Sequence, residues 1–170
     1  MINNERFLIF LSKLAEVYPI GRVKYAPGTL ASLIALVFGY YILTICKINC
    51  FLLFVFIFVI FSYLLCEAHV RVYNKKDPNE VVVDEFAGQF IAILGIIDST
   101  NISYILTSLL FSFVLFRFFD ITKIGPIKKF EKLPGGIGII ADDLVAGLFA
   151  FLTQAAILTS IGQPLIIKTL

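Results

Sequence analysis

Apolar and polar residues alternate in long blocks along this chain. Near its start, five apolar residues recur at helical three-four spacing, with charged residues between them: Phe7, Phe10, Leu11, Leu14 and Tyr18. This spacing is typical of an amphipathic helix, and we expect residues 4–18 to lie on a membrane surface.

Five apolar blocks follow, and each is a candidate membrane-crossing helix. Their bounds are 29–46, 50–66, 81–97, 104–119 and 144–161. A bilayer core about 30 Å thick needs roughly 20 helical residues, so these blocks are long enough with some mismatch. The first two should form a hairpin, and the acid-bearing third block either crosses or packs inside the bundle. The polar segment 120–143, rich in proline and glycine, is interpreted as a loop.

Composition identifies the solvent as lipid. Hydrophobic residues make up 59% of the 170 residues, and the mean hydropathy is +0.96, more than a soluble core of this size could bury. We predict one domain over residues 1–170, an all-α polytopic membrane bundle of about five apolar helices plus the N-terminal amphipathic interfacial helix. A net charge of +2 is too small for a nucleic-acid partner, whereas a homo-oligomer is compatible with this composition.

Basic residues fall almost entirely on one side of the five-span arrangement. Short loops rich in Lys and Arg stay on the cytoplasmic side, so we expect this side to be cytoplasmic. The opposite side keeps only Lys47 and Lys168, and Asp98 is its one acid, so the candidate catalytic residues converge at one depth. The cytoplasmic set comprises Arg6, Lys13, Arg22, Lys24, Arg71, Lys75, Lys76, Arg117, Lys123, Lys128, Lys129 and Lys132.

The third block carries two adjacent acids, Asp84 and Glu85. An ionisable group within an apolar helix costs several kcal/mol unless it is paired, hydrated or metal-bound, so both are functional candidates. The alternative is a solvated face at the cytoplasmic end of the helix. Gly88 shares a helical face with Asp84 and would let a ligand or a neighbouring helix approach closely.

The residues before these acids resemble a helix start. Asp77, Pro78 and Glu80 fit an N-cap, a first-turn proline and a glutamate at the third helical position. Alternatively, residues 81–83 are extended. In the first block, Thr29 of the YAPGT segment is suited to cap the helix and is also a candidate phosphate ligand.

A second acidic pair, Asp142 and Asp143, follows a glycine-rich turn in the segment GGIGIIADDLVAG. Backbone amides at Gly135 and Gly136 could cradle phosphate at a helix N-terminus. Adjacent helical residues point about 100° apart, so one aspartate is expected to bind directly while the other orients water or a neighbouring side chain.

Arg117, Asp120 and Lys123 recur at three-residue spacing where the fourth block ends. They favour phosphate capture, because guanidinium grips two phosphate oxygens while lysine supplies a point charge. The alternative is that Arg117 snorkels or pairs with Asp120. His69 is the only histidine, which excludes a catalytic triad and a three-histidine zinc site. The sequence has no apparent Cys or Ser nucleophile motif, so carboxylates with Mg²⁺ are the remaining apparatus for phosphate chemistry.

Three segments of the sequence resemble the phosphatidylglycerophosphatase A family: YAPGTLASL, DPNEVVVDEFAGQFIAI and FRFFDITKIGPIKKFEKLPGGIGIIADDLVAG. The resemblance implies Mg²⁺-dependent hydrolysis of phosphatidylglycerophosphate to phosphatidylglycerol and inorganic phosphate in a bacterial cytoplasmic membrane. One departure is Lys123-Ile124-Gly125-Pro126, where the family tends to have Lys-Pro-x-Pro. The family's basic motif falls on Arg117 and Lys123, and its acidic motifs fall on Asp84, Glu85, Asp120, Asp142 and Asp143.

Our hypothesis is that these acids hold Mg²⁺ against the phosphate of the lipid, with Asp84, Glu85 and Asp143 as the catalytic residues. Phosphate-binding candidates are Arg117, Lys123, Gly135, Gly136 and Thr29. A CDP-alcohol phosphotransferase is disfavoured because its Asp-x-x-Asp-Gly-x-x-Ala-Arg signature is absent from the sequence. The main rival is a small cation or proton transporter with acids in the bundle, although its path would need polar residues through the full membrane depth.

Overall fold

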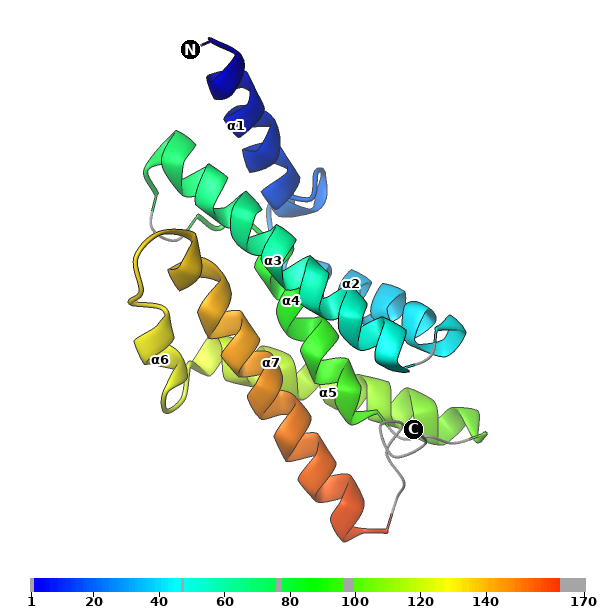
Figure 1. Cartoon of the computed structure of the whole chain (residues 1–170). Coiled ribbons are helices and arrows are strands. Elements are labelled where there is room, and N and C mark those ends of the chain that lie inside the picture. Colours follow the sequence, from blue (N-terminus) through cyan, green and yellow to red (C-terminus); the bar gives the residue numbers. More distant parts are fainter. Residues whose placement is uncertain (1, 47, 76–77, 97–99, 163–170) are drawn as a thin grey trace.

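Helices make up all the regular structure in the described part of the chain, which confirms the all-α prediction (Figure 1). The computed structural model describes residues 2–46, 48–75, 78–96 and 100–162. Lys47, Lys76, Asp77, Asp98 and Lys168 of the predictions above lie outside these residues. In chain order the helices are α1 (Ile2–Ala15), α2 (Pro27–Ile45), α3 (Ile48–Tyr73), α4 (Val83–Ala92), α5 (Ile102–Thr122), α6 (Ile127–Phe130) and α7 (Gly135–Ser160), with 3₁₀ turns at Ile20–Arg22 and Ile93–Gly95.

Four of these helices, α2, α3, α5 and α7, are long and apolar enough to cross a membrane. Each covers one of the predicted apolar blocks to within one residue. Large apolar side chains such as Val37, Phe56 and Leu110 are more than half exposed on their outer faces. A bundle in lipid needs no polar cover on that side, so the prediction of a membrane helical bundle is confirmed.

The third predicted block, 81–97, does not form a helix of spanning length. Its helical part runs from Val83 to Gly95, which is about 20 Å at 1.5 Å per residue. Eight of the ten α4 residues are buried, and Figure 1 shows α4 in the middle of the bundle, where it contacts α2, α3, α5 and α7. The alternative that this block packs inside the bundle is therefore correct, and Ile97 lies outside the described residues.

Glycines allow α4 and α7 to cross with their backbones in contact. A side chain at Gly147 would overlap the backbone carbonyl of Gly88, and one at Gly88 would overlap the Phe116 ring and the Asp143 carbonyl. Gly88 therefore admits a neighbouring helix, one of the two predicted possibilities. The crossing brings the first turn of α4 opposite the acidic pair of α7.

The interpretation of residues 120–143 as a loop is wrong over most of its length, because α5 continues to Thr122 and two further helices begin within this segment. Helix α7 begins at Gly135 rather than at residue 144, and the short α6 precedes it. A side chain at Gly136 would overlap the α3 backbone at Glu67, and one at Gly138 would overlap the Leu133 carbonyl. These glycines therefore allow close packing of the first α7 turns, which makes the helix longer than its apolar pattern predicts.

Both predicted helix starts also need correction. Helix α4 begins at Val83, so Pro78 and Glu80 precede it. The Val82 backbone amide instead donates a hydrogen bond to the Ala15 carbonyl at 3.1 Å, which ties this segment to the end of α1. Thr29 does not cap α2, because that helix begins at Pro27, and Thr29 lies inside its first turn.

Helix α1 packs against α3 and ends at Ala15, before the predicted bound at residue 18. Its buried side includes Ser12, whereas Phe7, Phe10 and Tyr18 of the predicted apolar face are 60%, 57% and 72% exposed. Of this apolar face, Leu11 packs against the core, whereas the three aromatic side chains are not covered by the described part of the chain. Its location on a membrane surface stays a prediction.

Candidate active site

The ends of α2, α4, α5 and α7 meet around a cavity of about 870 Å³, here called the polar cavity. The charged residues that the sequence singled out come from three different helices and the loop after α5, and all of them line it. They are Asp84, Glu85, Arg117, Asp120, Lys123, Asp142 and Asp143. Thr29 also lines the polar cavity. The predicted convergence at one end of the bundle is therefore observed.

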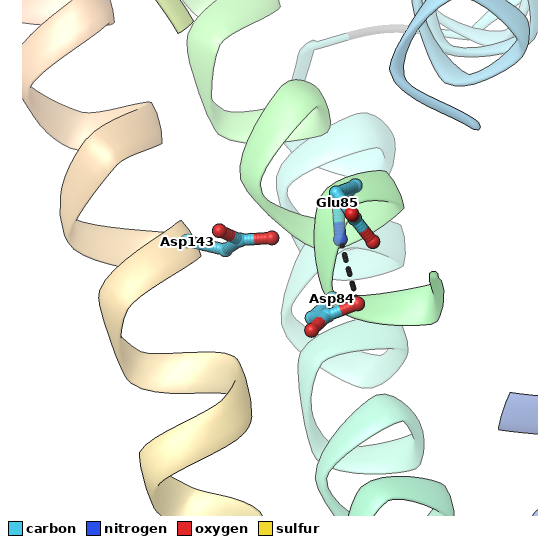
Figure 2. Close-up of side chains that lie close together, drawn as sticks. All are labelled: Asp84, Glu85 and Asp143. Carbon is cyan, nitrogen blue, oxygen red and sulfur yellow. Dashed lines mark hydrogen bonds between the residues drawn. The ribbon is translucent and has the colours of Figure 1, made fainter. Parts of the chain in front are cut away.

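Three of the acids form a cluster that we call the acidic trio: Asp84, Glu85 and Asp143. One carboxylate oxygen from each lies within 4.8 Å of the other two. Figure 2 shows Asp143 extending from α7 towards the first turn of α4, where the Glu85 amide donates a 3.1 Å hydrogen bond to Asp84 Oδ1. The short α4 thus contributes two of the three carboxylates.

Burial makes the acidic trio a candidate metal site. Asp84 and Asp143 are 8% and 4% exposed, and the buried Glu85 Oε2 has no hydrogen-bond partner. Three carboxylates at this spacing repel one another strongly where water is scarce, and a cation between them would offset that repulsion. Carboxylate oxygens suit hard divalent cations such as Mg²⁺.

The neighbouring Asp142 has a different partner. Its Oδ2 accepts a 2.9 Å hydrogen bond from Lys123 Nζ, which also donates to Glu131 Oε1 at 2.9 Å. Burial lowers the pKa of the Lys123 ammonium, but these hydrogen bonds outweigh it and raise the pKa above the ordinary lysine value. Lys123 therefore stays positively charged at the cavity wall, although a proline of the family pattern is missing beside it.

One nitrogen of the Arg117 guanidinium contacts two side chains. Its Nη1 lies 2.6 Å from Asp120 Oδ2 and donates a 3.3 Å hydrogen bond to Ser32 Oγ, which itself donates to the Gly28 carbonyl at 2.7 Å. The predicted pairing with Asp120 is thus observed. It leaves the buried Arg117 Nε without a hydrogen-bond partner, so the guanidinium retains donor capacity for a bound anion.

Sequence reasoning missed Gly28 and Ser32, which place α2 against this site. A side chain at Gly28 would overlap the Glu85 carboxylate, so glycine lets α2 lie against this carboxylate without displacing it. Both residues belong to the segment YAPGTLASL, whose small residues are the signal that could have identified them.

The structure does not bring Gly135 and Gly136 into the polar cavity. The Gly136 amide donates a 2.9 Å hydrogen bond to Glu67 Oε2 of α3. A carboxylate of the protein therefore occupies the donor that was expected to hold phosphate. The glycine-rich segment serves helix packing instead.

Deeper in the bundle, neutral side chains link the helices. Gln89 Nε2 of α4 donates to Ser112 Oγ of α5 at 3.2 Å, and Gln154 Nε2 of α7 donates to the Ser108 carbonyl at 2.9 Å. The charged residues of α4, α5 and α7 all belong to the cavity ends of these helices. A charged path through the bundle, as a cation transporter would use, is not formed by the described residues.

Comparison with known proteins identifies the family of the chain. A sequence model of the family described as Phosphatidylglycerophosphatase A matches residues 13–158. A Haemophilus influenzae protein named Phosphatidylglycerophosphatase A is 37% identical over 145 residues, covering 85% of this chain and 86% of that protein. An Escherichia coli protein of the same name is 31% identical over 151 residues, covering 88% of this chain and 82% of that protein.

A third relative carries another name. A Bacteroides thetaiotaomicron protein named "Putative phosphatidylinositol-3-phosphatase" is 37% identical over 87 residues, covering 51% of this chain and 53% of that protein. No solved structure matches the chain. The family match spans every residue of the polar cavity, and the chain belongs to the phosphatidylglycerophosphatase A family.

Proposed function

We propose that the chain hydrolyses the terminal phosphate monoester of phosphatidylglycerophosphate, with phosphatidylglycerol and inorganic phosphate as products. The observation that carries this proposal is the acidic trio beside the guanidinium of Arg117 in one cavity of a family member. Carboxylates suit a metal ion, and guanidinium suits phosphate oxygens.

The acidic trio is the proposed site for Mg²⁺. Its oxygens lie close enough to share one ion, and Glu85 Oε2 has no other partner. When bound, Mg²⁺ supplies positive charge to the phosphate oxygens and lowers the pKa of a coordinated water. Asp120 and Asp142 were also predicted to bind the metal. Because they form ion pairs with Arg117 and Lys123, we propose that they orient these two cations beside the metal site.

Arg117 and Lys123 are the proposed phosphate ligands. Arg117 Nε has no partner in the protein, and the raised pKa of Lys123 keeps its ammonium charged. Both cations stabilise negative charge on the phosphoryl oxygens as it develops in the transition state. Thr29 also lines the polar cavity, and its hydroxyl is the proposed donor of a further hydrogen bond to phosphate.

In the proposed reaction, a water oxygen attacks phosphorus as the bond from phosphorus to the glycerol oxygen breaks. A carboxylate of the acidic trio accepts the proton that the water loses. The leaving glycerol oxygen takes up a proton, which completes the alcohol of the product. The acyl chains stay in the bilayer while the headgroup enters the polar cavity.

The polar cavity is proposed to face the cytoplasm of a bacterium. Basic residues gather at this end of the bundle, where Arg22, Lys24, Lys123 and Lys132 line the polar cavity. Short loops rich in such residues stay on the cytoplasmic side of a bacterial inner membrane.

The test is release of inorganic phosphate from phosphatidylglycerophosphate by purified protein in detergent, with and without Mg²⁺. We expect Mg²⁺-dependent turnover that falls at least about a hundredfold in Asp84→Asn and Asp143→Asn, because each loses a carboxylate of the acidic trio. Glu5→Gln, an exposed carboxylate on α1, is the matched control and should keep full activity. Equal activity in all three variants would remove the acidic trio from the mechanism.

Phosphatidylinositol 3-phosphate belongs in the same assay because of the name of the Bacteroides relative. We expect slower phosphate release from this lipid than from phosphatidylglycerophosphate. The opposite order would change the assigned substrate while leaving the reaction type in place.

A further inference from the structure

An apolar groove of about 350 Å³ opens beside the polar cavity between α2 and α5. We call it the α2–α5 groove. Its walls are apolar side chains of α5, among them Phe113, Val114 and Phe118. It shares Thr29, Arg117 and Ile121 with the polar cavity, so the two spaces lie directly beside each other.

The α2–α5 groove lies on the outer face of a membrane-length helix. Val114, Phe118 and Ile121 are 50%, 49% and 68% exposed, whereas Ser112 and Phe116 of the same helix point into the bundle and are fully buried. In a membrane the exposed face of α5 contacts lipid. The α2–α5 groove therefore opens sideways to the bilayer, and its inner end reaches Arg117.

The polarity along this path matches a lipid phosphate. At Arg117 the lining changes within about one helical turn from charged groups to the aliphatic and aromatic side chains of α5. A phosphate monoester joined to a diacylglycerol has the same succession of anion and hydrocarbon. We infer that the α2–α5 groove holds an acyl chain of the substrate while its phosphate lies in the polar cavity, an inference that rests on the proposed function.

A second apolar groove near the polar cavity is a weaker choice. It has a volume of about 560 Å³, lies beside α1 among Phe10, Leu14 and Tyr18, and meets the polar cavity only at Arg22. The Arg22 guanidinium already donates a 2.8 Å hydrogen bond to Glu16 and lies over the Tyr18 ring. This groove therefore lacks the direct connection to Arg117 that the α2–α5 groove has.

The test compares two substrates with one headgroup: dioleoyl phosphatidylglycerophosphate in mixed micelles, and the water-soluble glycerophosphoglycerophosphate, which has no acyl chains. Val114→Trp fills the α2–α5 groove. Val37→Trp is the matched control, because Val37 is an exposed valine of α2 that lines neither the α2–α5 groove nor the polar cavity. The readout is the ratio of kcat/KM for the lipid to kcat/KM for the soluble compound.

We expect this ratio to fall about tenfold or more in Val114→Trp, the effect of losing roughly two buried methylene contacts. It should not change in Val37→Trp. An unchanged ratio in Val114→Trp would overturn the inference and leave the proposed function standing. Failure of the unaltered protein to release phosphate from either compound would defeat the proposed function itself.

A second measurement needs no variant, so it holds even if Val114→Trp fails to fold. The unaltered protein is irradiated with a phosphatidylglycerophosphate that carries a diazirine on one acyl chain, and adducts are located by mass spectrometry. Adducts within residues 113–122 would support the inference. Adducts confined to residues 10–18 would overturn it and favour the groove beside α1.

Discussion

Helices α3 and α4 follow each other in the chain but differ in length, hydropathy and burial. Helix α3 has 26 residues, and its most apolar stretch has a mean hydropathy of 2.7 with only 22% of it buried. Helix α4 has ten residues, carries two acids, and is buried over eight of its residues. In this bundle, high hydropathy therefore marks contact with lipid, whereas the most central helix is shorter and more polar.

The physical reason is that the two helices have different surroundings. Lipid offers no hydrogen bonds, so a helix that faces it must present apolar side chains. A helix enclosed by other helices contacts their backbones and side chains. Small residues let these helices pack closely, and polar side chains find hydrogen-bond partners there. Gly88 and Gln89 of α4 show both features, whereas the exposed face of α3 carries large residues such as Phe56.

The largest effect should come from enlarging a residue at the α4–α7 crossing. We expect Gly147→Leu to lower Tm by roughly 6–12 °C, because its side chain would overlap the Gly88 backbone and overpacking costs about 3 kcal/mol. Ala156→Leu, on the exposed side of the same helix, is the control and should leave Tm nearly unchanged. Thermal unfolding in detergent measures both. Similar Tm values for the two variants would contradict the conclusion that buried and lipid-facing surfaces differ in how tightly they are packed.

A smaller effect is expected from changing the shape of one cation. Arg117→Lys keeps the charge but loses the guanidinium that contacts Asp120 and Ser32, so kcat/KM for the lipid should fall roughly tenfold to a hundredfold. Arg71→Lys on α3 is the control, since its ion pair with Glu67 is 65% exposed on the arginine side. Equal kinetics in the two variants would show that the site needs only a positive charge.

The sequence predicts the lipid-facing part of this fold better than its centre. Hydropathy and charge asymmetry accumulate over long stretches, so the four long helices and the common end of the charged residues could be predicted. The start of α4 could not, because the Asp-Pro-x-Glu pattern fits a local cap while the Val82 amide bonds to Ala15 of α1. That tertiary partner is invisible in a local pattern.

The same limit applies within the candidate site. Glycines before an acidic pair are compatible with a phosphate-binding turn and with close helix packing. The Gly136 amide is hydrogen-bonded to Glu67, which favours packing, but Glu67 lies 69 residues away in the sequence and could not be identified from the local pattern. Residue spacing also left open whether Arg117 pairs with Asp120 or binds phosphate. The structure shows the pair, together with an unpaired nitrogen on the same guanidinium.

A modest effect should follow from removing a neutral buried contact of α4. Gln89→Met removes the hydrogen bond to Ser112 while nearly preserving side-chain volume, and such bonds within membranes are worth about 0.6 kcal/mol. We expect Tm to fall by about 1–3 °C. Leu53→Met on the exposed face of α3 should have no measurable effect. A fall in Tm as large as that of Gly147→Leu would show that hydrogen bonding stabilises the position of α4 as strongly as close packing does.

The smallest expected change in Tm comes from the segment between α3 and α4, and it depends on pH. The hydrogen bond from Lys75 lowers the pKa of Glu80 below its ordinary value of 4.5. The ionised carboxylate therefore contributes its full stabilisation at pH values above 4.5. This stability is lost as the pH falls through the lowered pKa. Because the pair is largely exposed, we expect Glu80→Gln to lower Tm by only about 1–2 °C at pH 7, with the gap closing in acid. A gap that widens on acidification would contradict this assignment.

The shortness of α4 also bears on how the protein is made. A segment of ten residues with two carboxylates is a poor substrate for insertion by itself, because it cannot span the hydrocarbon layer and would bring its acids into lipid. When α4 leaves the ribosome, α5 and α7, which later enclose it, have not yet been synthesised. We therefore expect α4 to enter the membrane only together with these later helices. A nascent chain that ends before Gly135 would then have α2, α3 and α5 in the membrane but lack α7 and a complete site.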